Sequence, residues 1–214
     1  MIKYIYAFGS ICRGEFDDFS DIDILIISEN GENDLISFKK YSVYKEITLA
    51  KLWEEGNPFA WHLHAESKLI YTYNGMDLFK IMGIPNNYIN ILNDLKNLTE
   101  IFNEAKESLL NDSQSQVFDL AIIFLVVRNV ASCFDLAISR TYNFSRDSAL
   151  RMHNDGLEIN LEIYQTIKNC RIYSTRGEGI EPSSKAINTA IESLPKIEKW
   201  IKELSFKTIN YEPI

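Results

Sequence analysis

The chain has 214 residues, of which 46% are hydrophobic and 24% charged, and its formal net charge is −8 at pH 7. This length and apolar content suffice for a buried core in one large or two small domains. The negative charge excludes long nucleic acid as the default partner, because a polyanion would be repelled. The three cysteines are widely spaced and lack a Cys-x-x-Cys motif, which favours a reducing compartment and offers no zinc site. No apolar stretch without charges is long enough to span a bilayer, so the composition favours a cytoplasmic protein without a membrane partner.

The first elements of the chain are two apolar runs, Tyr4–Phe8 and Ile22–Ile27, which predict two strands. Gly9 and Ser10 follow the first run, and this Gly-Ser step predicts the start of a short helix. The first amides of a helix have no acceptor within it and attract anions. Gly9 would let a phosphate approach closely, and the Ser10 hydroxyl could donate to it. We therefore expect a phosphate-binding turn between the two strands.

Two aspartates, Asp21 and Asp23, stand at the start of the second predicted strand. Side chains two residues apart in a strand point the same way, so both carboxylates should project together while Ile22 and Ile24 face the core. Adjacent carboxylates repel unless a cation lies between them, and Mg²⁺ takes oxygen ligands from carboxylates and substrate phosphates. The pattern therefore predicts that a metal ion and the phosphates of a substrate bind at the same site. The alternative is an ordinary strand pair with a solvated pair of aspartates.

The whole segment resembles the nucleotidyltransferase superfamily that includes DNA polymerase beta, and in particular its small bacterial members. That family has a Gly-Ser helix start, an Arg-Gly pair and a Ser-Asp-x-Asp strand in this order, and the matching positions here are Gly9, Ser10, Arg13, Gly14, Ser20, Asp21 and Asp23. The resemblance implies catalytic, metal-binding roles for both aspartates, with two Mg²⁺ ions. It also implies a nucleoside triphosphate, with ATP favoured, bound by Gly9, Ser10, Arg13 and Ser20. Arg13 would either neutralise phosphate or hold the helix after Gly9 in place.

Residues 1–84 are expected to form a small domain with a mixed sheet. Ser42–Leu49 alternates in polarity and predicts a third strand that carries Glu46. The resemblance implies a third catalytic, metal-binding carboxylate on a later strand, and Glu46 is the best positional match. A surface glutamate beside Lys45 is the alternative.

The rest of this domain is predicted as two helices and a strand. The helices are Lys51–Glu55 and Phe59–Ser67, separated by a Gly-Asn-Pro break, and the strand is Leu69–Tyr73. His62 and His64 diverge on a helix and have no third ligand near them in sequence, so they do not predict a metal site.

From about Pro85 the pattern changes to long helices, so residues 85–214 predict an all-α bundle, and the chain as a whole is of the α+β class. Apolar residues at helical spacing predict a helix over Tyr88–Leu110, a central buried helix over Val117–Ile138, and a last helix over Ser183–Leu204 that Pro195 kinks or splits.

Two arginines of the helical half stand out. Arg128 lies inside the central helix, where a guanidinium needs an acidic or phosphate partner, and Asp119 and Asp135 are the structural candidates. Arg176 lies in the turn-rich stretch Tyr173–Gly179, which predicts a loop, and is a candidate nucleotide contact.

The helical half also resembles, more weakly, the bundles of the HEPN superfamily. These carry an Arg followed by an Asn, and five positions after the Arg a catalytic His used in RNA cleavage. Arg128 and Asn129 match, but Cys133 stands at the position of the His, so the general acid/base is missing and the resemblance argues against RNA cleavage. Such a bundle could instead shape an acceptor site or a homodimer interface.

The first resemblance implies an enzyme that transfers a nucleoside monophosphate from a nucleoside triphosphate to an acceptor hydroxyl and releases pyrophosphate. The acceptor could be a small molecule, such as an aminoglycoside or lincosamide antibiotic, or a protein hydroxyl. The acidic surface favours a cationic acceptor. The alternative is a non-catalytic module of antitoxin type that binds a nucleotide or a partner, favoured if no third carboxylate comes near Asp21 and Asp23.

Overall fold

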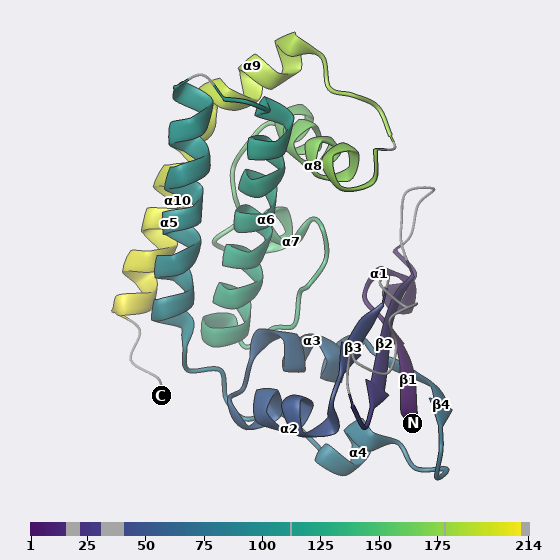
Figure 1. The fold of residues 1–214 in the computed structure, drawn as a ribbon. Helices are drawn as coiled ribbons and strands as arrows, with labels where there is room; N and C mark the ends of the chain where they lie inside the picture. Colours follow the sequence, from purple (N-terminus) through teal and green to yellow (C-terminus); the bar gives the residue numbers. More distant parts are fainter. Residues whose placement is uncertain (16–21, 31–40, 112, 178, 211–214) are drawn as a thin grey trace. The chain divides into compact units, whose positions relative to one another are not determined.

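The computed structural model describes residues 1–15, 22–30, 41–111, 113–177 and 179–210 (Figure 1). Ser20 and Asp21, which the sequence predicts in the site, lie outside these ranges. The chain divides into two compact units, Met1–Ile89 and Asn90–Ile214. The first holds the sheet and the second is helical, so the α+β class and the mixed sheet expected from the sequence are confirmed.

The first unit is built on a four-stranded sheet with the order β3-β2-β1-β4. Strand β1 pairs antiparallel with both β2 and β4, whereas β2 and β3 are parallel. The strands are β1 (Ile2–Phe8), β2 (Asp23–Ser28), β3 (Ser42–Tyr44) and β4 (Lys68–Thr72). The strand predicted over Leu69–Tyr73 is thus confirmed as β4, within one residue at each end.

Helices pack against one face of this sheet, where the core of the first unit lies (Figure 1). Inward-facing Tyr4, Tyr6 and Phe8 of β1 meet Leu25 and Ile27 of β2 and the apolar faces of the helices. The helices of this unit are α1 (Ser10–Arg13), α2 (Glu46–Glu54), α3 (Pro58–Glu66) and α4 (Leu78–Met82). The predicted break between α2 and α3 is present, because Asn57 caps α3 through the Phe59 amide and Pro58 occupies its first turn.

The predicted facing of β2 is wrong. Ile22 is 59% exposed, while Leu25 and Ile27 are completely buried. Asp23 pairs with Phe8, so it belongs to the same face as Leu25 and Ile27, at the end of the strand. Its carboxylate stays exposed because the core ends before this position.

The second unit is a helical bundle around α6 (Gln116–Phe134), which contacts α5, α7, α8, α9 and α10. The other helices are α5 (Ile91–Leu110), α7 (Ser148–Arg151), α8 (Leu161–Arg176), α9 (Ser184–Glu192) and α10 (Leu194–Ile209). The predicted split of the last helix is confirmed, with Pro195 in the first turn of α10, where a missing amide costs no helical bond. The loop predicted over Tyr173–Gly179 is wrong up to Arg176, because α8 continues to that residue.

The central helix continues into a π-helical turn, η2 (Asp135–Ser139), as predicted for a buried helix that reaches Ile138. Among the described residues, one helical stretch, Gln116–Ser139, is long and apolar enough to cross a membrane by length and composition alone. This stretch carries Asp119, Arg128 and Asp135, so it does not contradict the expectation that no stretch free of charges is long enough to cross a bilayer. Moreover, 61% of its most apolar window is buried inside the structure, as in the core helix of a bundle.

Candidate active site

The predicted phosphate-binding turn forms between β1 and α1. Gly9 adopts φ 75° and ψ −145°, a conformation that residues with a side chain rarely adopt. The amides of Cys12 and Arg13 donate to the Gly9 carbonyl oxygen at 3.0 and 3.3 Å. Helix geometry therefore gives the amides of Ser10 and Ile11 no acceptor within the helix, so they stand at its open start. Helix α1 is a single short turn, and Gly14 caps its end in the left-handed conformation.

Gly9 and Asp23 meet at the mouth of this turn. A Cβ atom built on Gly9 would lie 2.6 Å from the Oδ2 atom of Asp23. The close approach follows from the strand pairing, because Asp23 is opposite Phe8, the residue before Gly9. The structure thus brings a carboxylate against the backbone of the Gly-Ser turn, as the sequence predicts.

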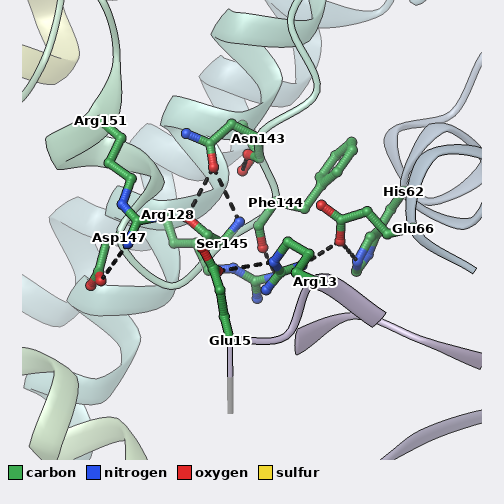
Figure 2. Close-up of polar contacts among 11 residues, drawn as sticks. Arg13, Glu15, His62, Glu66, Arg128, Asn143, Phe144, Ser145, Asp147 and Arg151 are labelled. Atoms are coloured by element: carbon green, nitrogen blue, oxygen red, sulfur yellow. Dashed lines mark hydrogen bonds and ion pairs between the residues drawn. The ribbon is translucent and has the colours of Figure 1, made fainter. Parts of the chain in front are cut away.

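Arg13, the last residue of α1, makes two ion pairs with carboxylates (Figure 2). Its Nε atom lies 3.0 Å from Glu15 Oε2, and its guanidinium also bonds to Glu66 at the end of α3. The Glu66 side chain is only 8% exposed and lies 2.9 Å from the Nε2 atom of His62. Arg13 therefore holds α1 against α3, which is one of the two roles that the sequence left open for it.

Glu66 is a site residue that no pattern in the sequence singles out. It stands four residues after His62, a spacing that places both side chains on one face of a helix. No local pattern connects it with Arg13, which is 53 residues away in the chain. His64 contacts Trp61 edge to face at 6.0 Å between ring centroids and takes no part in the Arg13 contacts described here.

The structure does not bring Glu46 to Asp23. Strand β3 ends at Tyr44, and Glu46 is the first residue of α2, so the predicted strand over Ser42–Leu49 is wrong beyond Tyr44. Tyr44 pairs with Ile27, four positions from Asp23 along β2, which corresponds to about 13 Å in a strand. Glu46 lies beyond that end of the sheet, 3.3 Å from the Nζ atom of Lys3. Its predicted role as third metal ligand gains no support from this position.

Within the described parts of the chain, no group of three His, Cys, Asp or Glu side chains is arranged to hold a metal ion. Asp23 is the described member of the predicted metal-binding pair, since Asp21 falls in a range that the structure does not describe. The donor chemistry nevertheless suits Mg²⁺, which commonly takes one or two carboxylates and completes its shell with substrate phosphates and water. The space that a Cβ on Gly9 would fill is the space beside the Asp23 carboxylate.

In the helical unit, Arg128 supports the loop between η2 and α7. Its guanidinium donates to the Phe144 carbonyl oxygen at 3.0 Å (Figure 2), and its own carbonyl oxygen accepts from the Ser148 hydroxyl at 3.2 Å. Asp119, one of its two predicted partners, accepts instead from Ser108 and Ser113 at 2.6 Å each. The guanidinium thus meets part of its bonding requirement through a backbone carbonyl.

Comparison with protein families matches residues 2–96 to the family described as Nucleotidyltransferase domain. One similar solved structure is the spectinomycin adenyltransferase AAD(9) from Enterococcus faecialis, determined with ATP and spectinomycin. It shares 14% sequence identity with this chain, with a TM-score of 0.47, over 94% of this chain and 92% of that chain. No curated protein matches the sequence.

The N-terminal part of the chain is therefore a nucleotidyltransferase domain, as the pattern from Gly9 to Asp23 predicts. This match, which covers fewer than half of the residues, supports an enzyme of nucleotidyl transfer. The resemblance of residues 85–214 to HEPN bundles stays a prediction, because the family match ends at residue 96.

Proposed function

We propose that this protein is a Mg²⁺-dependent nucleotidyltransferase that moves a nucleoside monophosphate from a nucleoside triphosphate, with ATP favoured, to a hydroxyl of a small cationic acceptor. Pyrophosphate is the other product. The observation that carries the proposal is the contact between the Gly9 backbone and the Asp23 carboxylate, within a matched nucleotidyltransferase domain.

In this proposal the Gly-Ser turn binds phosphate and the aspartates bind the metal. The amides at the start of α1 and the Ser10 hydroxyl bind the outer phosphates, and Ser20, which lies outside the described residues, is a further proposed contact of the nucleotide. Asp21 and Asp23 would hold the metal, which supplies charge neutralisation and alignment of the triphosphate. Because Asp23 lies against the Gly9 backbone, its carboxylate and the phosphate-binding amides converge on one small volume. The third carboxylate is not Glu46 in this arrangement.

The acceptor is inferred from charge. The chain carries 30 acidic and 22 basic residues, so its surface attracts cations more than anions. A cationic acceptor that carries amines and hydroxyl groups, such as an aminoglycoside, would be attracted by this negative charge. A protein hydroxyl is the other acceptor that we propose to test. We also propose a cytoplasmic location and, for residues 85–214, a role in shaping the acceptor site or a homodimer interface.

The test of the donor site needs no acceptor. We expect ATP with Mg²⁺ to raise the melting temperature of the protein, because a ligand at 100 times its dissociation constant adds about 2.7 kcal/mol to the stability of the folded state. The rise should disappear without Mg²⁺ and in the variant Asp23→Asn. Titrations with GTP, CTP and UTP then identify the preferred triphosphate.

The variant Glu29→Gln is a matched control for Asp23→Asn. Glu29 follows β2 at the end opposite Asp23, where it pairs with the chain's amino terminus at 3.5 Å. Its substitution removes one carboxylate of the same domain and should leave the ATP-induced rise intact. If wild type shows no rise with any triphosphate, the proposed donor site is refuted.

Pyrophosphate release tests the acceptor and the alternative function together. Wild type is incubated with Mg²⁺ and the preferred triphosphate, alone and with aminoglycosides, spectinomycin, lincosamides or a neutral sugar. Release that depends on a cationic acceptor, with a matching mass increase of that acceptor, supports the proposal. A triphosphate that binds without any transfer, to these acceptors or to proteins of a bacterial lysate, would instead favour the non-catalytic binding module.

A further inference from the structure

Helix α3 contacts both ends of the Gly-Ser turn, that is, residues Phe8–Gly14. At the start of the turn, the Phe8 ring lies edge to face against Phe59 and His62, with centroid distances of 5.8 and 5.6 Å. At its end, Arg13 bonds to Glu66. Phe59, His62 and Glu66 follow one another at intervals of three and four residues, so they form one face of α3.

The charges around Arg13 argue against a direct role in phosphate binding. Its guanidinium is 18% exposed and already bonds to two carboxylates, those of Glu15 and Glu66. Its positive charge is therefore neutralised within the protein before a triphosphate arrives. Moreover, a guanidinium held in a paired geometry keeps its hydrogen-bond donors directed at its partners.

We propose that Glu66 is a positioning residue for nucleotide binding. By holding Arg13, it fixes the turn Phe8–Gly14 against α3, so that Ser10 and Asp23 meet the triphosphate in one geometry. Arg13 acts through this contact and not as a phosphate ligand. The Nε2 atom of His62 lies 2.9 Å from the Glu66 carboxylate, on the same face of α3. The inference rests on the proposed nucleotide site.

The test compares the dissociation constant of ATP with Mg²⁺ in Arg13→Gln, Glu66→Gln, the double variant and wild type. If Glu66 positions the turn through Arg13, each single substitution weakens ATP binding by about tenfold, and the double variant is no weaker than either single one. If Arg13 instead binds phosphate, Glu66→Gln removes one of the two carboxylates paired with its guanidinium, and ATP binds as tightly as in wild type or more tightly. The direction of the Glu66→Gln effect thus separates the two roles.

Glu198→Gln controls for a general loss of stability. Glu198 lies in α10, pairs with Lys106 at 2.7 Å, and is 25% exposed. Its substitution should lower the melting temperature without changing ATP affinity. Glu66→Asp, which keeps the charge one methylene group shorter, should restore part of the affinity and serves if Glu66→Gln fails to fold.

Three results would overturn the inference while wild type still binds ATP. They are unchanged or tighter ATP binding in Glu66→Gln, losses that add in the double variant, and no recovery in Glu66→Asp relative to Glu66→Gln. An absence of ATP binding by wild type is a different result, because it refutes the proposed function itself.

Discussion

Gly9 and Asp23 approach so closely that a Cβ atom on Gly9 would lie 2.6 Å from the Asp23 Oδ2 atom. The substitution Gly9→Ala therefore has two effects. It strains a backbone held at φ 75° and ψ −145°, at about 1–3 kcal/mol, and it pushes the Asp23 carboxylate away from the turn. We expect nucleotidyl transfer to fall by at least about 100-fold, since displacement of a site group by about 1 Å can have that effect. The measurement is the rate of pyrophosphate release with Mg²⁺ and ATP.

Gly75→Ala is the matched control. Gly75 has φ 76°, nearly the same as Gly9, but an added Cβ would meet no atom within 4 Å. Gly75→Ala should therefore carry the strain of a positive φ without moving a carboxylate. Equal losses of activity in the two variants would show that strain, and not the contact with Asp23, is responsible.

Glu46→Gln tests the reassignment of Glu46. In the structure Glu46 starts α2 and pairs with Lys3, at the end of the sheet away from Asp23. We expect the rate of pyrophosphate release to stay within about threefold of wild type, because removing one oxyanion-type or metal contact typically costs 100-fold or more. A loss of about 100-fold in the rate of pyrophosphate release would instead support Glu46 as a metal ligand.

How far the sequence predicts the structure depends on whether the signal is local. The start of α3 was predictable because Asn57 and Pro58 are a cap and a first-turn residue in their own right. The same holds for the division of α9 from α10 at Pro195. The turn at Gly9 was predictable because a glycine, a serine and two flanking apolar runs define it without reference to the rest of the chain.

The failures come from positions where tertiary context decides. Val43, Ile47 and Leu49 occupy odd positions of Ser42–Leu49, like the apolar residues of a strand, yet Ile47 is 76% exposed and belongs to the first turn of α2. Alternation over so few residues does not separate a strand end from a helix start. The contact between Glu66 and Arg13 joins two elements that are distant in sequence, so no local pattern could reveal it.

The buried Asp135 predicts a pH dependence of stability. Burial raises the pKa of this carboxyl from 3.8 to about 6, helped by the charge of Asp155 and opposed by a hydrogen bond from Ser139. Well below pH 3.8 the group is protonated in the folded and unfolded states alike. Between about pH 3.8 and 6 the unfolded chain releases this proton while the folded state keeps it, so the stability of the folded state falls by about 2–3 kcal/mol over this range and changes no further above it.

Asp135→Asn should remove this loss, because the amide stays neutral at every pH. Urea unfolding of wild type and variant at pH 4 and pH 7.5 measures the difference in unfolding free energy, in which the other titrating groups cancel. We expect the unfolding free energy of the variant, relative to that of wild type, to be about 2–3 kcal/mol higher at pH 7.5 than at pH 4. A difference that does not change with pH would mean that Asp135 is not held with a raised pKa.

Gly56→Ala tests how the end of the first unit is anchored. The stretch that follows α4 is held to α2 and α3 by two tryptophans, since Trp53 Nε1 donates to the Gly83 carbonyl oxygen and Trp61 Nε1 to that of Asn86, each at 3.0 Å. An added Cβ on Gly56 would lie 2.4 Å from the Asn86 carbonyl oxygen, which is backbone and cannot turn away. We expect a loss of more than about 3 kcal/mol in unfolding free energy, because strain and overpacking add.

The control for Gly56→Ala is Gly177→Ala. Gly177 has φ 64°, against 62° for Gly56, but an added Cβ there would meet nothing within 4 Å. It should lose only the strain of the left-handed conformation, about 1–2 kcal/mol. Because the two glycines have nearly the same φ, the difference between the two variants in urea unfolding measures the contacts with the backbone carbonyls of Asn86 and Asn87, each 2.4 Å from the added Cβ on Gly56. Equal losses would mean that this stretch yields easily, and that the two tryptophan hydrogen bonds do not hold it against α2 and α3.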